Sequence, residues 1–157
     1  MRARNPARRG YLDDTAWVPH RLDMMASPAW RSRPRPLAKM IERLEIEHMR
    51  HGGKENGNLV VTYDQFEAYG VSRRAICQMI EAGQALGIIE VIKPENWYGD
   101  VRPPNVYRLT YIPAKGKRAP TDEWNSITQE QAEIIVEKAK ISTERQVTTM
   151  QGRRSVA

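Results

Sequence analysis

Residues 62–86 read TYDQFEAYGVSRRAICQMIEAGQAL and contain two short helical patterns joined through Gly70. Thr62 and Gln65 have the spacing of a capping box, which predicts that the first helix begins there. Ser72 is a candidate N-cap for the second helix. The inner stripe of that helix is formed by Ile76, Ile80, Gly83 and Leu86. Two helices joined by a short glycine turn predict a helix-turn-helix.

The sequence on either side adds one helix before this pair and a hairpin after it. An amphipathic helix is predicted by apolar residues at helical spacing: Leu37, Met40, Ile41 and Leu44. Residues 59–61 are a short β-prone run, and residues 88–93 and 106–112 predict two strands around a loop rich in turn residues. The order predicts an α+β fold: a winged helix-turn-helix with a three-helix core, a short antiparallel sheet and a wing hairpin.

We divide the chain into four parts. Residues 1–16 are rich in arginine and are expected to be a disordered basic arm. Residues 17–112 are the predicted winged-helix domain with a docked N-terminal segment, in which Ser27 and Pro28 begin a short helix. Residues 113–127 read as a basic linker. Residues 128–157 form a marginal helix and tail, for which a partner or a second copy would supply the packing.

Composition and charge limit the class of protein. The chain has 157 residues, which fits one domain with extensions, and no run approaches the ~20 apolar residues of a membrane span. No apolar stretch follows the basic N-terminus, so no secretory signal is expected. The single cysteine, Cys77, excludes an internal disulfide and suits a reducing compartment. We therefore expect a cytoplasmic protein.

The net charge of +6 lies mainly outside the predicted fold. Residues 1–36 carry eight arginines against three aspartates, whereas residues 37–112 carry nine basic residues against ten acidic ones. Either the basic arms supply much of the attraction to phosphates, or the nearly neutral core does something other than bind DNA. A third possibility is that the basic arms are solvated and bind no partner.

The second helix of the pair is the candidate recognition helix. A helix in the major groove presents its N-terminal residues to base edges, and arginine and glutamine can contact guanine and adenine in a bidentate way. The candidate DNA-binding residues of this helix are Ser72, Arg73, Arg74 and Gln78. A solvated helix face is the alternative.

The wing and the arms supply further candidates. The wing candidates are Lys93, Arg102, Asn105 and Arg108. Trp97 and Tyr98 at the tip either stack on bases or fold back onto the domain. Backbone contacts from the arms are assigned to Arg2, Arg4, Arg8, Arg9, Lys115, Lys117 and Arg118.

Catalysis and metal binding have little support in the sequence. His48 and His51 lie three residues apart, but neither a zinc-protease motif nor a Cys-x-x-Cys is present. Histidines at a helix end that complement the dipole are the simpler interpretation. Cys77 has no evident catalytic partner and is expected to be a half-buried small residue. We expect no enzyme activity, no metal, no cofactor and no small-molecule substrate.

Two stretches resemble a family of small winged helix-turn-helix proteins of α-proteobacteria, often associated with plasmids, phages or integrated elements. The first stretch is residues 47–57, EHMRHGGKENG, followed by LVVTY at 59–63 and by Phe66, Tyr69, Gly70 and Val71. The second is ALGIIE at 85–90 with the run from Pro104 to Tyr111. The likeness covers roughly residues 17–125. It implies DNA binding in transcription control or in replication of mobile DNA, but no defined site residues.

Sequence-specific binding of duplex DNA is the expected function, as a transcriptional regulator or an accessory replication protein of a mobile element. A homodimer is expected because one small module rarely gives sufficient affinity and specificity. Two alternatives stay open. The domain is a protein-interaction module, or it binds RNA or single strands through Trp97, Tyr98 and the arms.

Overall fold

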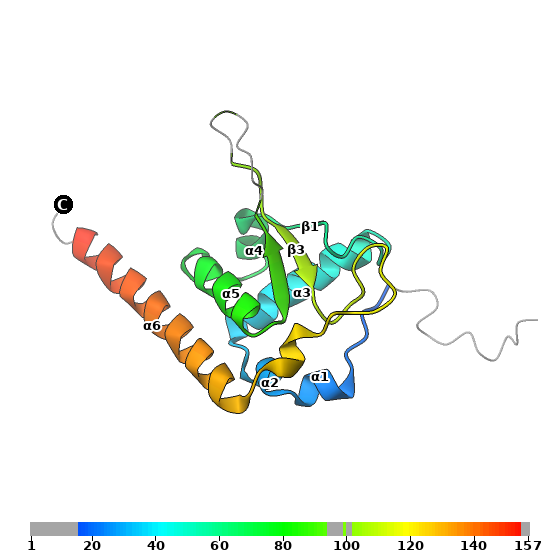
Figure 1. Ribbon diagram of the computed structural model, residues 1–157. Coiled ribbons are helices and arrows are strands. Elements are labelled where there is room, and N and C mark those ends of the chain that lie inside the picture. Colours follow the sequence, from blue (N-terminus) through cyan, green and yellow to red (C-terminus); the bar gives the residue numbers. More distant parts are fainter. Residues whose placement is uncertain (1–15, 94–98, 100–101, 155–157) are drawn as a thin grey trace, which may run out of the picture.

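The computed structural model describes residues 16–93, 99 and 102–154 of the chain (Figure 1). Its elements follow in chain order: α1 Leu22–Ala26, α2 Pro28–Ser32, α3 Arg35–Arg50, β1 Leu59–Val60, α4 Tyr63–Ala68, α5 Arg73–Ala85, β2 Ile89–Ile92, β3 Val106–Leu109, the 3-10 helix η2 Glu123–Ser126, and α6 Gln129–Arg154. From α3 to β3 the order agrees with the order predicted from the sequence. The fold class is α+β.

The three strands form one antiparallel sheet in the order β1-β3-β2. Leu59 pairs with Tyr107, and Ile89 pairs with Leu109. These four side chains are buried. The last strand is shorter than predicted, because the chain turns at Thr110. Its hydroxyl donates to the carbonyls of Gly87 and Ile88.

The core lies between the sheet, α3 and α5. The predicted stripes of both helices are confirmed, since Leu37, Met40, Ile41 and Leu44 of α3 and Ile76 and Ile80 of α5 are all buried. Gly83 lets α5 approach its neighbours closely. A Cβ at this position would lie 2.8 Å from Cδ1 of Ile89 and 3.0 Å from Cδ1 of Leu37.

The helix starts are also as the sequence predicts. Ser27 accepts a hydrogen bond from the amide of Trp30, with Pro28 at the first position of α2. Thr62 and Gln65 form the predicted capping box of α4. Ser72 is the N-cap of α5 by position, but its side chain makes no capping bond. Helix α1 was not predicted.

The segment between the sheet and α6 differs from the expected linker. Its Trp124 is fully buried with 1% of its surface exposed. The amides of Thr121 and Asp122 both donate to the carbonyl of Thr110. Gly87, with φ of +69°, lies so close that a Cβ there would meet the backbone of Glu123 and Trp124 at 2.7 Å. The segment is part of the folded domain.

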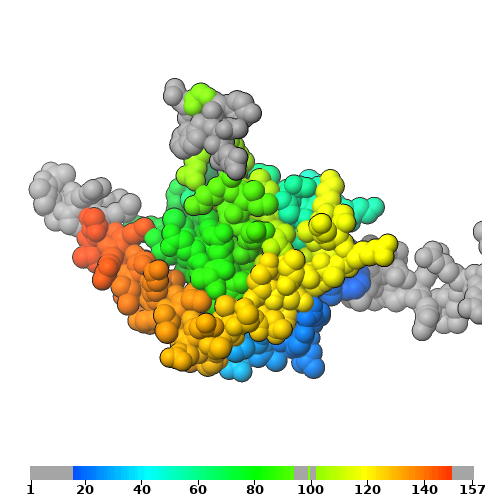
Figure 2. All heavy atoms as spheres, in the orientation of Figure 1, coloured from blue at the N-terminus to red at the C-terminus, as the bar shows by residue number. Residues whose placement is uncertain are grey.

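Helix α6 packs against α5 and α2 and then continues along one side of the molecule (orange to red in Figures 1 and 2). Thr128 and Gln131 exchange the two hydrogen bonds predicted from their spacing. Ala132 and Ala139 are buried against the domain. No helix in the part of the chain that the structure describes is both long and apolar enough to cross a bilayer.

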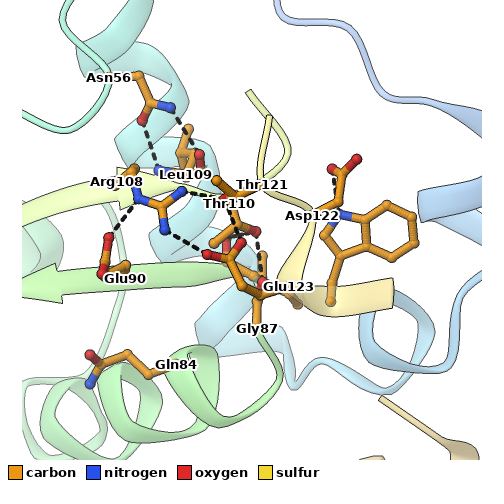
Figure 3. A network of polar contacts seen from close by, with 12 residues as sticks. Asn56, Gln84, Gly87, Glu90, Arg108, Leu109, Thr110, Thr121, Asp122 and Glu123 are labelled. Carbon is orange, nitrogen blue, oxygen red and sulfur yellow. Dashed lines mark hydrogen bonds and ion pairs between the residues drawn. The ribbon is translucent and has the colours of Figure 1, made fainter. Parts of the chain in front are cut away.

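Asn56 ties the turn before β1 to the end of β3 (Figure 3). Its Nδ2 donates to the carbonyls of Leu109 and Ile112, both at 2.8 Å, and its Oδ1 accepts from the amide of Leu109 at 2.7 Å. The side chain is buried, so these bonds take the place of the hydrogen bonds that water makes to the same groups in the unfolded chain.

Substitution at Asn56 is therefore expected to destabilise the fold. Asn56→Ala leaves buried backbone groups without partners and should lower the free energy of unfolding by about 2–4 kcal/mol. Asn56→Asp should cost at least as much, because an oxygen would face two carbonyls. Urea denaturation checks this, with Asn58→Ala at an exposed position as the control. Values for both Asn56 variants within about 0.5 kcal/mol of wild type would contradict the assignment.

Candidate nucleic-acid interface

Helix α5 is exposed on one narrow side only, the exposed arc, and this side includes the first residues of the helix. At about 100° per residue, its exposed positions span roughly a third of the circumference. They are Arg73, Arg74, Cys77, Glu81, Gln84 and Ala85. The opposite side faces the core, and one flank lies against α6. Any groove contact by α5 must come from this arc.

Gln78 does not belong to the exposed arc, contrary to the sequence prediction. It is 7% exposed and lies on the same flank of α5 as the buried Ala75 and Ala82. Its Oε1 has no hydrogen-bond partner among the described residues. Helical spacing alone did not show this burial, which arises from the packing of the folded domain. Gln78 is not available to a base edge in this conformation.

Arg73 is exposed but paired. Its guanidinium contacts the carboxylates of Asp64 and Glu67 on α4. The hydrogen bond to Asp64, and next the one to Glu67, raise the pKa of Arg73. Arg74 is its exposed neighbour, and within the described ranges no carboxylate forms an ion pair with it. The two adjacent arginines therefore differ: Arg74 is the one whose charge is not already compensated.

A cleft of about 420 Å³ opens beside the N-terminus of α5, between the start of α4 and the base of the hairpin. Its lining is Val61, Thr62, Tyr63, Asp64, Arg73, Arg102, Pro103, Pro104 and Asn105. Arg102 and Arg73 bring positive charge, and Asp64 brings a negative one. Burial raises the pKa of Tyr63, so its phenol stays a neutral donor. Apart from Asp64, the charged groups and the phenol suit an anionic ligand.

Tyr63 and Asp64 were not among the predicted site residues. The sequence offers one weak signal for them, their place in the first turn of α4 directly after the capping threonine. Nothing in the chain order shows that this turn meets residues 102–105, which follow some forty positions later.

Asn105 supports the base of the hairpin from inside. The residue is buried, and its Nδ2 donates to the hydroxyl of Tyr107 at 3.4 Å. Burial raises the pKa of Tyr107 to about 12. Asn105 also lines the cleft, so its predicted DNA contact stays a prediction beside this packing role.

Arg108, a predicted DNA contact, is held by contacts within the domain (Figure 3). Its Nε donates to Glu90 at 2.5 Å, its Nη2 to Glu123 at 2.7 Å, and its Nη1 to the hydroxyl of Thr121. The guanidinium thus joins β3 to β2 and to the segment before η2. Two carboxylates already compensate its charge.

The remaining wing candidates are exposed to solvent. Lys93, directly after β2, and Arg102, before β3, are both exposed on the two sides of the hairpin. Ser72 is exposed as well. Trp97 and Tyr98 lie outside the described residues.

The arm residues fall into three groups. Arg2, Arg4, Arg8 and Arg9 lie outside the described residues. Lys115 pairs with Glu55 at 2.8 Å, which reduces its use for a phosphate. Lys117 and Arg118 are exposed.

Among the described residues, no group of three or more His, Cys, Asp or Glu side chains is placed so that it could hold a metal ion. His48 is buried, and burial lowers its pKa. His51 lies 3.0 Å from Glu47 on the same helix. Cys77 is exposed, not half-buried as expected.

Comparison with known proteins identified no relative: no family model matches the chain, and neither a curated protein nor a solved structure matches it.

Proposed function

We propose that this chain binds duplex DNA as a winged helix-turn-helix, with the N-terminus of α5 in the major groove and the β2–β3 hairpin beside it. The observation that carries the proposal is the exposed start of α5 next to a cleft at the base of the hairpin, with Arg73 and Arg102 in its lining. The order α3-β1-α4-α5-β2-β3 and the sheet order β1-β3-β2 also support it, since both are compatible with that fold.

We assign different DNA contacts to two arginines. Arg74 stands on the open arc of α5, where an arginine can contact guanine O6 and N7. Arg102 stands on the rim of the cleft, where it is suited to a backbone phosphate. Arg73 must first break its ion pairs with Asp64 and Glu67, so its net contribution to the binding free energy is smaller.

In the biological role that we propose, this binding serves transcription control or the replication of a mobile element. The family resemblance of residues 17–125 implies this role. The exposed Lys93, Lys117 and Arg118 would add contacts to the phosphate backbone without reading sequence.

Substitution of these two arginines should weaken binding in different ways. Arg74→Ala should lower the affinity for a selected duplex by about 1–3 kcal/mol, or roughly 5- to 150-fold, and relax the preference at one base pair. Arg102→Ala should weaken all duplexes alike and reduce the slope of log K against log salt by about 1. Fluorescence anisotropy over a salt series measures both quantities.

The matched control is Arg31→Ala, an exposed arginine of α2, a helix that lies away from the hairpin (Figure 1). It should leave affinity and salt slope unchanged. Equal losses for all three variants would indicate attraction by net charge alone. Tighter binding of single strands than of duplex would favour the alternative of a single-strand binder, and no binding at low salt would favour a protein-interaction module.

A further inference from the structure

Helix α6 has apolar residues on two opposite sides. The inner side, which faces α5 and α2, carries the buried Ala132 and Ala139. The outer side carries Ile134, which is 62% exposed, and Ile141, which is 40% exposed. Two isoleucines seven residues apart lie on one line of a helix, as at the seam of a helix pair. Something is therefore expected to cover this line.

A shallow groove on α6 defines the outer face. Its lining is Ile134, Glu137, Lys138, Ile141, Ser142 and Arg145. Glu130 joins this face, because at about 100° per residue it lies within roughly 60° of Ile134, as do Glu137, Lys138 and Arg145. Figure 2 shows α6 along the edge of the molecule.

The charges on this outer face are arranged symmetrically. The midpoint between Ile134 and Ile141 falls between Glu137 and Lys138. Glu130 and Arg145 lie equally far from that midpoint on opposite sides. In both pairs, an acidic residue on one side of the midpoint corresponds to a basic residue at the same distance on the other side.

We propose that the outer face of α6 binds the same face of a second copy of this chain, with the two helices antiparallel. A twofold axis at the midpoint sets Ile134 against Ile141 of the other copy, and likewise Glu137 against Lys138 and Glu130 against Arg145. Each contact occurs twice, which is the self-complementary pattern of a twofold interface.

The length of α6 agrees with this arrangement. The helix has 26 residues, and from Glu144 to Thr149 all side chains but Val147 are exposed. Isolated helices are marginal, and this stretch holds two β-branched threonines in a row, Thr148 and Thr149. Packing by a second copy would stabilise the helix beyond the edge of its own domain.

The test uses sedimentation equilibrium of the full chain over a concentration series. Wild type should dimerise in the micromolar range. Ile134→Glu combined with Ile141→Glu should be monomeric at the same concentrations. A wild-type protein that stays monomeric, or a dimer that the isoleucine variant leaves unchanged, would overturn the proposal.

Charge reversal tests the antiparallel register. Glu137→Lys alone and Lys138→Glu alone should each raise the dimer dissociation constant on the order of tenfold, since two attractive pairs become repulsive. The double variant should recover wild-type dimerisation. Mixing the two single variants, one of them isotope-labelled, should give mainly heterodimers in native mass spectrometry.

The matched control is Lys140→Glu, an exposed lysine of α6 that points away from the outer face. It should leave the dissociation constant unchanged, and all variants should keep the wild-type circular dichroism spectrum. A double variant as weak as either single variant, or mixing without heterodimers, would rule out this pairing.

Discussion

Gly87→Ala should lower the free energy of unfolding by about 4 kcal/mol, from two separate causes. Gly87 has φ of +69°, a conformation that costs any residue with a Cβ. The new Cβ would also lie 2.7 Å from the backbone of Glu123 and Trp124, which cannot move as a flexible side chain does. The clash must displace the segment that leads into η2.

Gly52→Ala separates the two causes. Gly52 has the same φ of +69°, but nothing lies within 4 Å of its Cβ position. This variant should lose only about 1 kcal/mol, the cost of the backbone conformation. Urea denaturation of both variants gives the difference. If Gly87→Ala costs no more than Gly52→Ala, residues 121–124 do not pack on Gly87.

Trp124→Ala should lower the free energy of unfolding by about 3–5 kcal/mol, because it empties the space of a fully buried indole. The Nε1 of Trp124 also donates to Asp122 at 2.9 Å, and Arg21 lies over the ring at 5.5 Å. Arg21 in turn pairs with Asp122. The substitution should therefore loosen the docked N-terminal segment as well as η2.

Trp17→Ala is the matched control, since Trp17 is 54% exposed, and it should change stability by less than about 0.5 kcal/mol. Amide hydrogen exchange should show faster exchange at Thr121 and Asp122 in Trp124→Ala only. The double variant Gly87→Ala with Trp124→Ala should lose less than the sum of both, because the two changes disrupt one contact. A loss below about 1 kcal/mol for Trp124→Ala would contradict its place in the core.

Local rules predicted the elements well. The capping box of Thr62 and Gln65, the Ser27-Pro28 helix start and the apolar stripe of α3 depend on residues three or four positions apart, and all three are confirmed. Their physics acts within one helical turn, so the sequence alone contains it.

Tertiary contacts decided the features that the sequence prediction missed. Arg108 looked like a free wing arginine, but Glu90 and Glu123, both well separated from it in sequence, hold its guanidinium. Gln78 was predicted on the outer side of α5, but its side chain is buried in the folded domain. Trp124 stands among polar residues with no periodicity, so no pattern marked it as part of the core.

Selection from a random duplex pool by the full chain, followed by sequencing of the bound fraction, tests the central claim most directly. We expect one enriched motif whose binding survives about 0.15 M salt and is lost in Arg74→Ala. If α6 pairs two copies, the motif should have twofold symmetry. The monomeric variant Ile134→Glu with Ile141→Glu should then bind only one half-site at a time. Weak binding without a motif, which disappears as salt rises, would contradict specific recognition of duplex DNA by α5.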